Sequence, residues 1–139
     1  MKHGTKNSAL GVAGIVLGSA LATPALADRS AEVRAYVSNQ LASNYAAREI
    51  GRNCKSMRAV ESKIGGAAMG LKKTLMAKGY TKEEINAGLK GVKLSGGKAS
   101  GKAMVLKMGA VEGNEASYCS VGDTEIANKT FIGSVLKKK

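Results

Sequence analysis

Proline is absent from the chain after Pro24, and this absence is the feature that most constrains the fold. Proline interrupts a helix because it lacks a backbone N–H group and clashes with the preceding turn. Over residues 30–52, apolar side chains recur at spacings of three to five, which is typical of one face of an amphipathic helix. No segment shows a convincing run of strand alternation. The sequence therefore predicts an all-α fold, a small bundle of four to five helices.

Several further segments carry an apolar helical face: residues 56–79, 82–91, 102–111 and 114–137. Gly79 can supply the left-handed position that ends one of these helices. Thr81 and Glu84 have the spacing of a capping box, which favours a helix start at residue 82. Residues 91–101 are rich in glycine and serine, with interleaved lysines, and they predict a flexible loop.

The first residues have the three-part layout of a secretory signal peptide. Lys2 and Lys6 give a basic start, residues 9–21 are uncharged, and Ala25 and Ala27 place small residues at the recognition positions for cleavage. An uncleaved membrane anchor is the alternative, because the apolar stretch approaches the roughly 20 residues that span a bilayer. We expect a signal peptide over residues 1–27 and a single domain over residues 28–139. Export by the general secretory pathway would place this domain in the periplasm, with secretion as an alternative.

The two cysteines, Cys54 and Cys119, both belong to the predicted mature domain. An even number of cysteines in an oxidising compartment favours a disulfide. Their separation of 65 positions would close a long loop, worth about 4 kcal/mol in the chain-entropy model. Two free thiols or a metal site are the alternatives, although no other soft ligand lies nearby in the sequence.

His3 is the only histidine, and it belongs to the predicted signal peptide. A mature domain without histidine cannot use Ser-His-Asp, Cys-His or histidine-based metal chemistry. The residues from Gly96 to Lys102 have the glycine and lysine spacing of a phosphate-binding loop, but Ala103 stands where serine or threonine is needed. We expect no catalytic residue, no cofactor and no metal; an enzyme that uses only lysine, tyrosine or carboxylate groups is the alternative.

The formal charge of the chain is +12. The predicted signal peptide carries two of the 22 basic residues and none of the 10 acidic ones, which leaves +10 for the mature domain. Such a charge favours anionic partners. All five arginines lie between Arg29 and Arg58, whereas residues 85–111 contain five lysines and no acid. These lysines are the candidate anion-binding residues: Lys90, Lys93, Lys98, Lys102 and Lys107. A face that only keeps the protein soluble is the alternative, and lysine lacks the fork that arginine uses on phosphate and guanine.

Three stretches carry a likeness to a known family: Glu49–Cys54, Gly79–Thr81 before Glu84-Ile85, and Ser117–Ala127 continuing to residues 132–136. They resemble domain-of-unknown-function family 5333, small exported proteins of alphaproteobacteria. The resemblance rests mainly on the ending Tyr-Cys-x-x-Gly-x-x-Glu-Ile. It implies export and a pairing of Cys54 with Cys119, and it carries no catalytic residue. The lysine- and glycine-rich middle departs from the family, which is usually more acidic and more helical there.

These observations together predict a non-enzymatic periplasmic protein, an envelope-associated interaction module with a basic surface. Its expected partner is an anionic component of the envelope or an acidic protein, with peripheral contact to a membrane and no nucleic acid. Amphipathic helices, abundant glycine and positive charge also fit a second class of protein. This alternative is a secreted cationic factor that is membrane-active or inhibitory.

Overall fold

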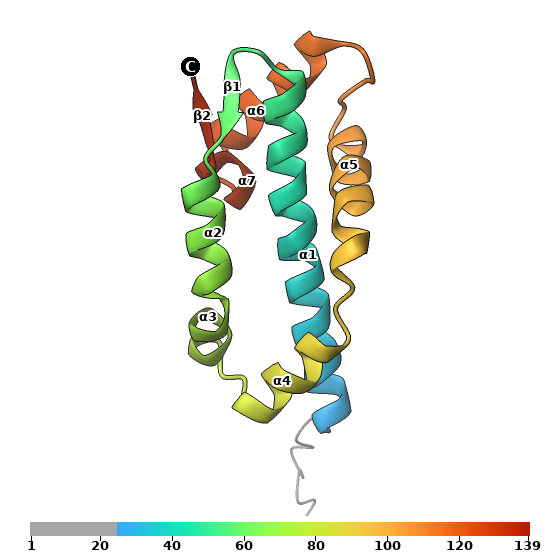
Figure 1. Ribbon diagram of the computed structural model, residues 1–139, viewed down its shortest axis with the longest axis vertical. Helices are drawn as coiled ribbons and strands as arrows, with labels where there is room; N and C mark the ends of the chain where they lie inside the picture. Colours follow the sequence, from blue (N-terminus) through green and yellow to red (C-terminus); the bar gives the residue numbers. More distant parts are fainter. Residues whose placement is uncertain (1–24) are drawn as a thin grey trace, which may run out of the picture.

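The longest element is α1 (Leu26–Asn53), a helix of 28 residues that runs the length of the molecule in Figure 1. This computed structural model describes residues 25–139. Residues 1–24 of the predicted signal peptide lie outside the described residues. The helix predicted over residues 30–52 is confirmed. It begins earlier than predicted, so that the predicted cleavage position after Ala27 falls in its first turn. Its buried residues include Val33, Val37 and Ile50, which gives α1 one continuous inner face.

The other elements follow in chain order: β1 (Met57–Ala59), α2 (Glu61–Met69), α3 (Leu71–Ala77), α4 (Lys82–Lys90), the short 3₁₀ helix η1 (Leu94–Gly96), α5 (Gly97–Lys107), α6 (Glu115–Ala127), α7 (Phe131–Ser134) and β2 (Leu136–Lys138). Helix α5 lies alongside α1, and α4 packs across the N-terminal part of α1 (Figure 1). The predicted all-α class is confirmed. The described residues contain seven α-helices rather than four to five, because two of the predicted helices are broken.

The two broken helices are those predicted over residues 56–79 and 114–137. The first begins as strand β1 and is interrupted at Gly70, where α2 gives way to α3. The second ends at Ala127, and Lys129 adopts a left-handed conformation with φ of 53°. Thr130 then caps the short helix α7, with its side chain accepting a hydrogen bond from the N–H of Gly133 at 3.1 Å. The break between α6 and α7 lets the end of the chain turn back toward β1.

A two-stranded antiparallel sheet joins distant parts of the chain, and it was not predicted. Strand β1 pairs with β2, with Arg58 opposite Lys137 and Ala59 opposite Leu136. Each strand has only three residues, too few for the alternation of apolar and polar residues to stand out in the sequence. The sheet brings the C-terminus next to the residues that follow α1 (Figure 1).

The predicted loop over residues 91–101 is wrong for its second half. Helix α5 begins at Gly97, and both Gly97 and Gly101 face α1, where a side chain would not fit. A Cβ atom at Gly101 would lie 2.5 Å from the Cβ of Tyr45 and 2.8 Å from the backbone oxygen of Ala42. The glycines therefore allow two helices to approach closely and do not mark a loop.

The predicted start of α4 is confirmed. The Oγ1 atom of Thr81 accepts a hydrogen bond from the N–H of Glu84 at 3.2 Å, and the N–H of Thr81 donates to the Glu84 carboxylate at 2.9 Å. Gly79 has a φ of +88°, the left-handed position predicted for it. The sequence therefore locates this turn and the helix after it correctly.

Buried side chains form two separate clusters along α1. The first cluster surrounds the C-terminal half of α1 and includes Ile50, Met57 and Tyr118. The second cluster surrounds the N-terminal half and includes Val33 and Leu75. Between the two clusters, Ala42, Ser43 and Asn44 of α1 are also buried, and two of these three residues are polar.

Candidate anion-binding site

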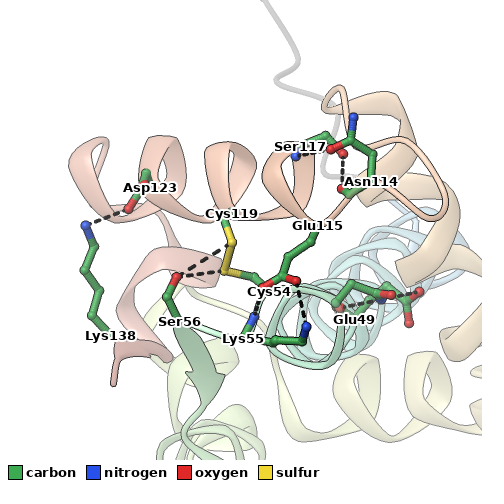
Figure 2. Close-up of a disulfide and its surroundings, with 11 residues drawn as sticks. Glu49, Cys54, Lys55, Ser56, Asn114, Glu115, Ser117, Cys119, Asp123 and Lys138 are labelled. Carbon is green, nitrogen blue, oxygen red and sulfur yellow. Dashed lines mark hydrogen bonds and ion pairs between the residues drawn. A yellow bond between two sulfur atoms is a disulfide. The ribbon is translucent and has the colours of Figure 1, made fainter.

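The predicted disulfide is present and joins Cys54, directly after α1, to Cys119 in α6. Their Cα atoms are 5.1 Å apart, and the bridge spans 65 positions of sequence. Figure 2 shows the Oγ atom of Ser56 next to both sulfur atoms, 3.2 Å from that of Cys54 and 3.7 Å from that of Cys119. The N–H of Lys55 donates to Glu115 at 3.0 Å in the same region. The bridge thus holds α6 against the end of α1, where the chain turns into β1.

All five predicted anion-binding lysines are exposed, and they belong to α4, to the segment that follows it and to α5: Lys90, Lys93, Lys98, Lys102 and Lys107. Lys102 forms an ion pair with Glu112, which lies just beyond the acid-free stretch. Lys98 and Lys102 are one turn apart on α5, whereas Lys107 lies about 140° further around the helix. Lys90 is the last residue of α4, and Lys93 lies between α4 and η1. Their role in anion binding stays a prediction.

The structure instead gathers three arginines around a shallow pocket of about 190 Å³. The lining residues are Arg48, Gly51, Arg52, Arg58, Ala59 and Glu61. Arg48 and Arg52 are one helical turn apart near the end of α1, and Arg58 is the central residue of β1. Gly51 lets β1 lie directly against α1, because a Cβ atom there would be 2.7 Å from the backbone nitrogen of Ala59.

One of the three arginines is neutralised within the pocket. The Nε and Nη2 atoms of Arg48 donate to the two carboxylate oxygens of Glu61 at 3.0 to 3.2 Å and 2.8 Å. The guanidinium of Arg48 also lies over the ring of Tyr45, 5.2 Å from its centre. These contacts hold the Arg48 side chain at the side of the pocket. Because its charge is paired with that of Glu61, little of it is available to a ligand.

The other two arginines keep most of their charge available. Arg52 is half-exposed, and its closest carboxylate oxygen, from Glu49, is 3.8 Å away. Within residues 25–139, Arg58 takes part in no ion pair, and its ladder partner is another exposed cation, Lys137. Like charges placed directly opposite each other destabilise a strand pair. Arg52, Arg58 and Lys137 therefore form a positive surface that an anion would stabilise, and we call these three residues the arginine site.

Part of the signal for this site was visible in the sequence. The restriction of all arginines to residues 29–58, and the spacing of four between Arg48 and Arg52, are apparent without a structure. Arg58 joins them only because the chain reverses after Cys54 and pairs with β2. Lys137, near the end of the chain, reaches the site through the same pairing. Sequence reasoning favoured the lysine stretch because its charges are neighbours along the chain.

Three carboxylates should make the folded protein sensitive to acid. The guanidinium of Arg48 lowers the pKa of Glu61 by hydrogen bonding, and the backbone N–H of Lys55 lowers the pKa of Glu115. The N–H of Thr81, followed by Arg29, lowers the pKa of Glu84. A carboxylate whose pKa is lowered by folding stabilises the protein above its unfolded pKa, about 4.3, and this contribution disappears as the pH falls through the folded pKa.

We therefore expect the urea midpoint of unfolding to be constant above about pH 5.5 and to fall progressively below pH 4.5. Replacing Glu84→Gln should lower the midpoint at pH 7 and make the decline at acid pH smaller. Urea titrations followed by circular dichroism between pH 7 and pH 3 measure both effects. An unchanged midpoint down to pH 3 would show that these hydrogen bonds contribute nothing to stability.

No helix within residues 25–139 is both long and apolar enough to cross a membrane. Within the same residues, histidine, cysteine, aspartate and glutamate side chains form no group of three that could hold a metal ion.

Comparison with known families gives one match. The family model of DUF5333, described as a family of unknown function, covers residues 29–137. Nothing among curated proteins or solved structures matches the chain. The matched residues include both cysteines and all members of the arginine site, and the resemblance seen in the sequence is confirmed.

Proposed function

This chain belongs to DUF5333, a family of unknown function, and from that premise we propose that it is an exported, non-enzymatic protein whose basic surface binds an anionic component of the cell envelope. The disulfide between Cys54 and Cys119 is compatible with an oxidising compartment such as the periplasm. The predicted signal peptide over residues 1–27 supplies the route of export. The resulting protein would carry a formal charge of +10 to a surface rich in anionic groups.

The arginine site is the observation that carries this proposal. Arginine presents a planar fork of donors that matches a phosphate or carboxylate in two places at once. Arg52 and Arg58 offer two such forks beside one shallow pocket, with Lys137 next to Arg58. The predicted lysines lie on several faces, and one of them is already paired with Glu112. We therefore place anion binding at the arginine site, and we propose phosphate groups as the ligand.

A binding role, rather than catalysis, agrees with the chemistry of this pocket. Among residues 25–139, Glu61 is the one carboxylate that lines the pocket; Arg48 holds it in a two-point ion pair that lowers its pKa, so it stays ionised. A general acid needs a raised pKa, and a general base needs a free lone pair facing the substrate. The pocket is also shallow, and it does not exclude water from a reacting group.

Vesicle binding tests the proposal. The oxidised protein recovered after export should co-sediment with phosphatidylglycerol vesicles at low salt, and should not co-sediment with phosphatidylcholine vesicles or at 0.5 M salt. The double variant Arg52→Gln with Arg58→Gln should bind at least about tenfold more weakly. The double variant Lys90→Gln with Lys93→Gln removes the same charge from another face and should bind within about threefold of the original protein.

Equal losses of vesicle binding in the two double variants would show that only net charge matters for binding. That result would overturn the assignment of anion binding to the arginine site. If soluble pyrophosphate releases the protein from the vesicles, the site binds phosphate groups. If it does not, the protein recognises the membrane surface. The alternative function, a membrane-active factor, predicts something further: dye should leak from the phosphatidylglycerol vesicles. We expect binding without leakage.

A further inference from the structure

A second pocket, of about 320 Å³, lies against the middle of α1. Its lining residues are Val37, Gln40, Leu41 and Asn44 of α1, Ala68 of α2, Leu71 of α3, Leu89 of α4, and Val92 and Leu94 of the following segment. The pocket borders the second buried cluster, because Val37 belongs to that cluster and Leu71, Leu89 and Val92 pack against it. It shares no residue with the arginine site.

Two residues that line this pocket, Gln40 and Asn44, each have one buried side-chain amide atom without a hydrogen-bond partner in residues 25–139. The Nε2 atom of Gln40 and the Oδ1 atom of Asn44 are buried, and neither has a partner within residues 25–139. Asn44 is only 7% exposed. Buried polar groups are normally paired, so two unpaired atoms in one pocket call for an explanation. Because the residues are one helical turn apart, they present a donor and an acceptor close together on α1.

Water is a poor occupant for this space. The volume would hold about ten water molecules at roughly 30 Å³ each, yet seven of the nine lining residues are apolar and offer water no partner. Leu94, at 72% exposure, leaves a large apolar side chain in solvent at the same pocket. An aliphatic occupant would cover this surface and gain from its removal from water. The volume also lies within the range of small-molecule sites, about 300 to 1,000 Å³.

We propose that this pocket binds a small aliphatic amide, an acyl chain in amide linkage. The acyl chain packs against the apolar walls, the ligand carbonyl accepts a hydrogen bond from Gln40, and the ligand N–H donates to Asn44. An amide supplies one donor and one acceptor, which is the complement of the two unpaired atoms. The complementarity is kept when both side-chain amides rotate by 180°, because each then offers its other atom, whereas rotation of one alone would present two donors or two acceptors.

N-methyldecanamide is a suitable probe, and methyl decanoate is its matched control. The ester has the same chain and a carbonyl group but lacks the N–H group. Titration followed by ¹H–¹⁵N NMR should shift the side-chain NH₂ signals of Gln40 and Asn44 in a saturable way. The amide should bind about tenfold more tightly than the ester, because the ester leaves the Asn44 oxygen unpaired.

Three substitutions locate the site. Ala68→Phe, at an exposed position of α2, should fill the pocket and weaken binding of the amide at least about tenfold without disturbing the amide pair. Asn44→Leu should abolish the preference for the amide over the ester. Asn39→Leu makes the same change on the exposed face of α1 and should leave both affinities unchanged.

The proposal is overturned if the amide and the ester bind equally, or if neither shifts the two side-chain signals. It is also overturned if Ala68→Phe leaves the affinity for the amide unchanged. The inference does not rest on the proposed function: the double variant Arg52→Gln with Arg58→Gln should bind the amide normally. Loss of vesicle binding in that variant therefore says nothing against this pocket, and a failure at the pocket says nothing against the arginine site.

Discussion

Removal of the disulfide by the double substitution Cys54→Ser with Cys119→Ser should lower the free energy of unfolding by about 4 kcal/mol. The bridge closes a loop of 65 positions, and its loss frees the unfolded chain to adopt many more conformations. At roughly 4 °C per kcal/mol for a domain of this size, the melting temperature should fall by about 15 °C. Thermal unfolding followed by circular dichroism measures this shift.

The structure also indicates which part of the molecule should loosen first. The bridge joins the end of α1 to α6, and the chain beyond α6 continues through α7 to the strand pair (Figure 2). Hydrogen exchange in the double variant should therefore lose protection first in α6, α7 and β2. The contact between α1 and α5 contains no sulfur and should keep its protection longer.

The matched control is the original protein reduced with dithiothreitol. It should show the same loss of stability as the double variant, because both lack the same covalent link. A loss below about 1 kcal/mol in both would mean that packing alone holds α6 to α1. A large loss in the serine variant alone would point to its new hydroxyl groups, since Cys54 is fully buried.

The features predicted correctly from the sequence are those encoded locally. The apolar spacing of α1, the capping box of Thr81 and Glu84, and the left-handed Gly79 each depend on residues within a few positions of one another. The disulfide is a long-range contact, but it could be predicted because only two cysteines are available to pair. These features suffice for the helical class and for the way α1 and α6 are joined.

The arginine site depends on information that is not local. Strands β1 and β2 are each three residues long, and their pairing joins residues almost 80 positions apart. Without that pairing, Arg58 and Lys137 have no reason to be considered together. Three of the predicted lysines lie on α5, and the helical turn places Lys107 about 140° around the helix from Lys102. Charge density along a chain is therefore a poor guide to charge density on the surface of a helical protein.

The glycines of residues 91–101 led to the prediction that the structure corrects. Their abundance suggested a loop, because glycine is a poor helix former. The structure shows that Gly97 and Gly101 are needed inside α5, where the helix touches α1. Gly66, in α2, has no atom within 4 Å of the position a Cβ would take. Packing against α1 thus explains the glycine at residue 101, whereas the packing at residue 66 does not require one.

The difference in packing between Gly101 and Gly66 predicts that the same substitution changes the stability of the protein in opposite directions at the two positions. Gly101→Leu should destabilise the protein by about 3 kcal/mol or more, because the new side chain would force α5 away from Tyr45 and from the backbone of α1. Gly66→Leu makes the same change at an open position. It should not destabilise the protein, and it should gain up to about 0.8 kcal/mol, since leucine is the better helix former at both positions.

Urea unfolding of the two variants measures the difference directly. Because helix propensity favours leucine in both, any loss at residue 101 comes from packing between α1 and α5. That packing is the most extensive contact between elements in residues 25–139, so its disruption should also lower the cooperativity of unfolding. If both substitutions were neutral or stabilising, residues 97–101 would not lie against α1 in solution, and the flexible loop predicted from their composition would be the better description.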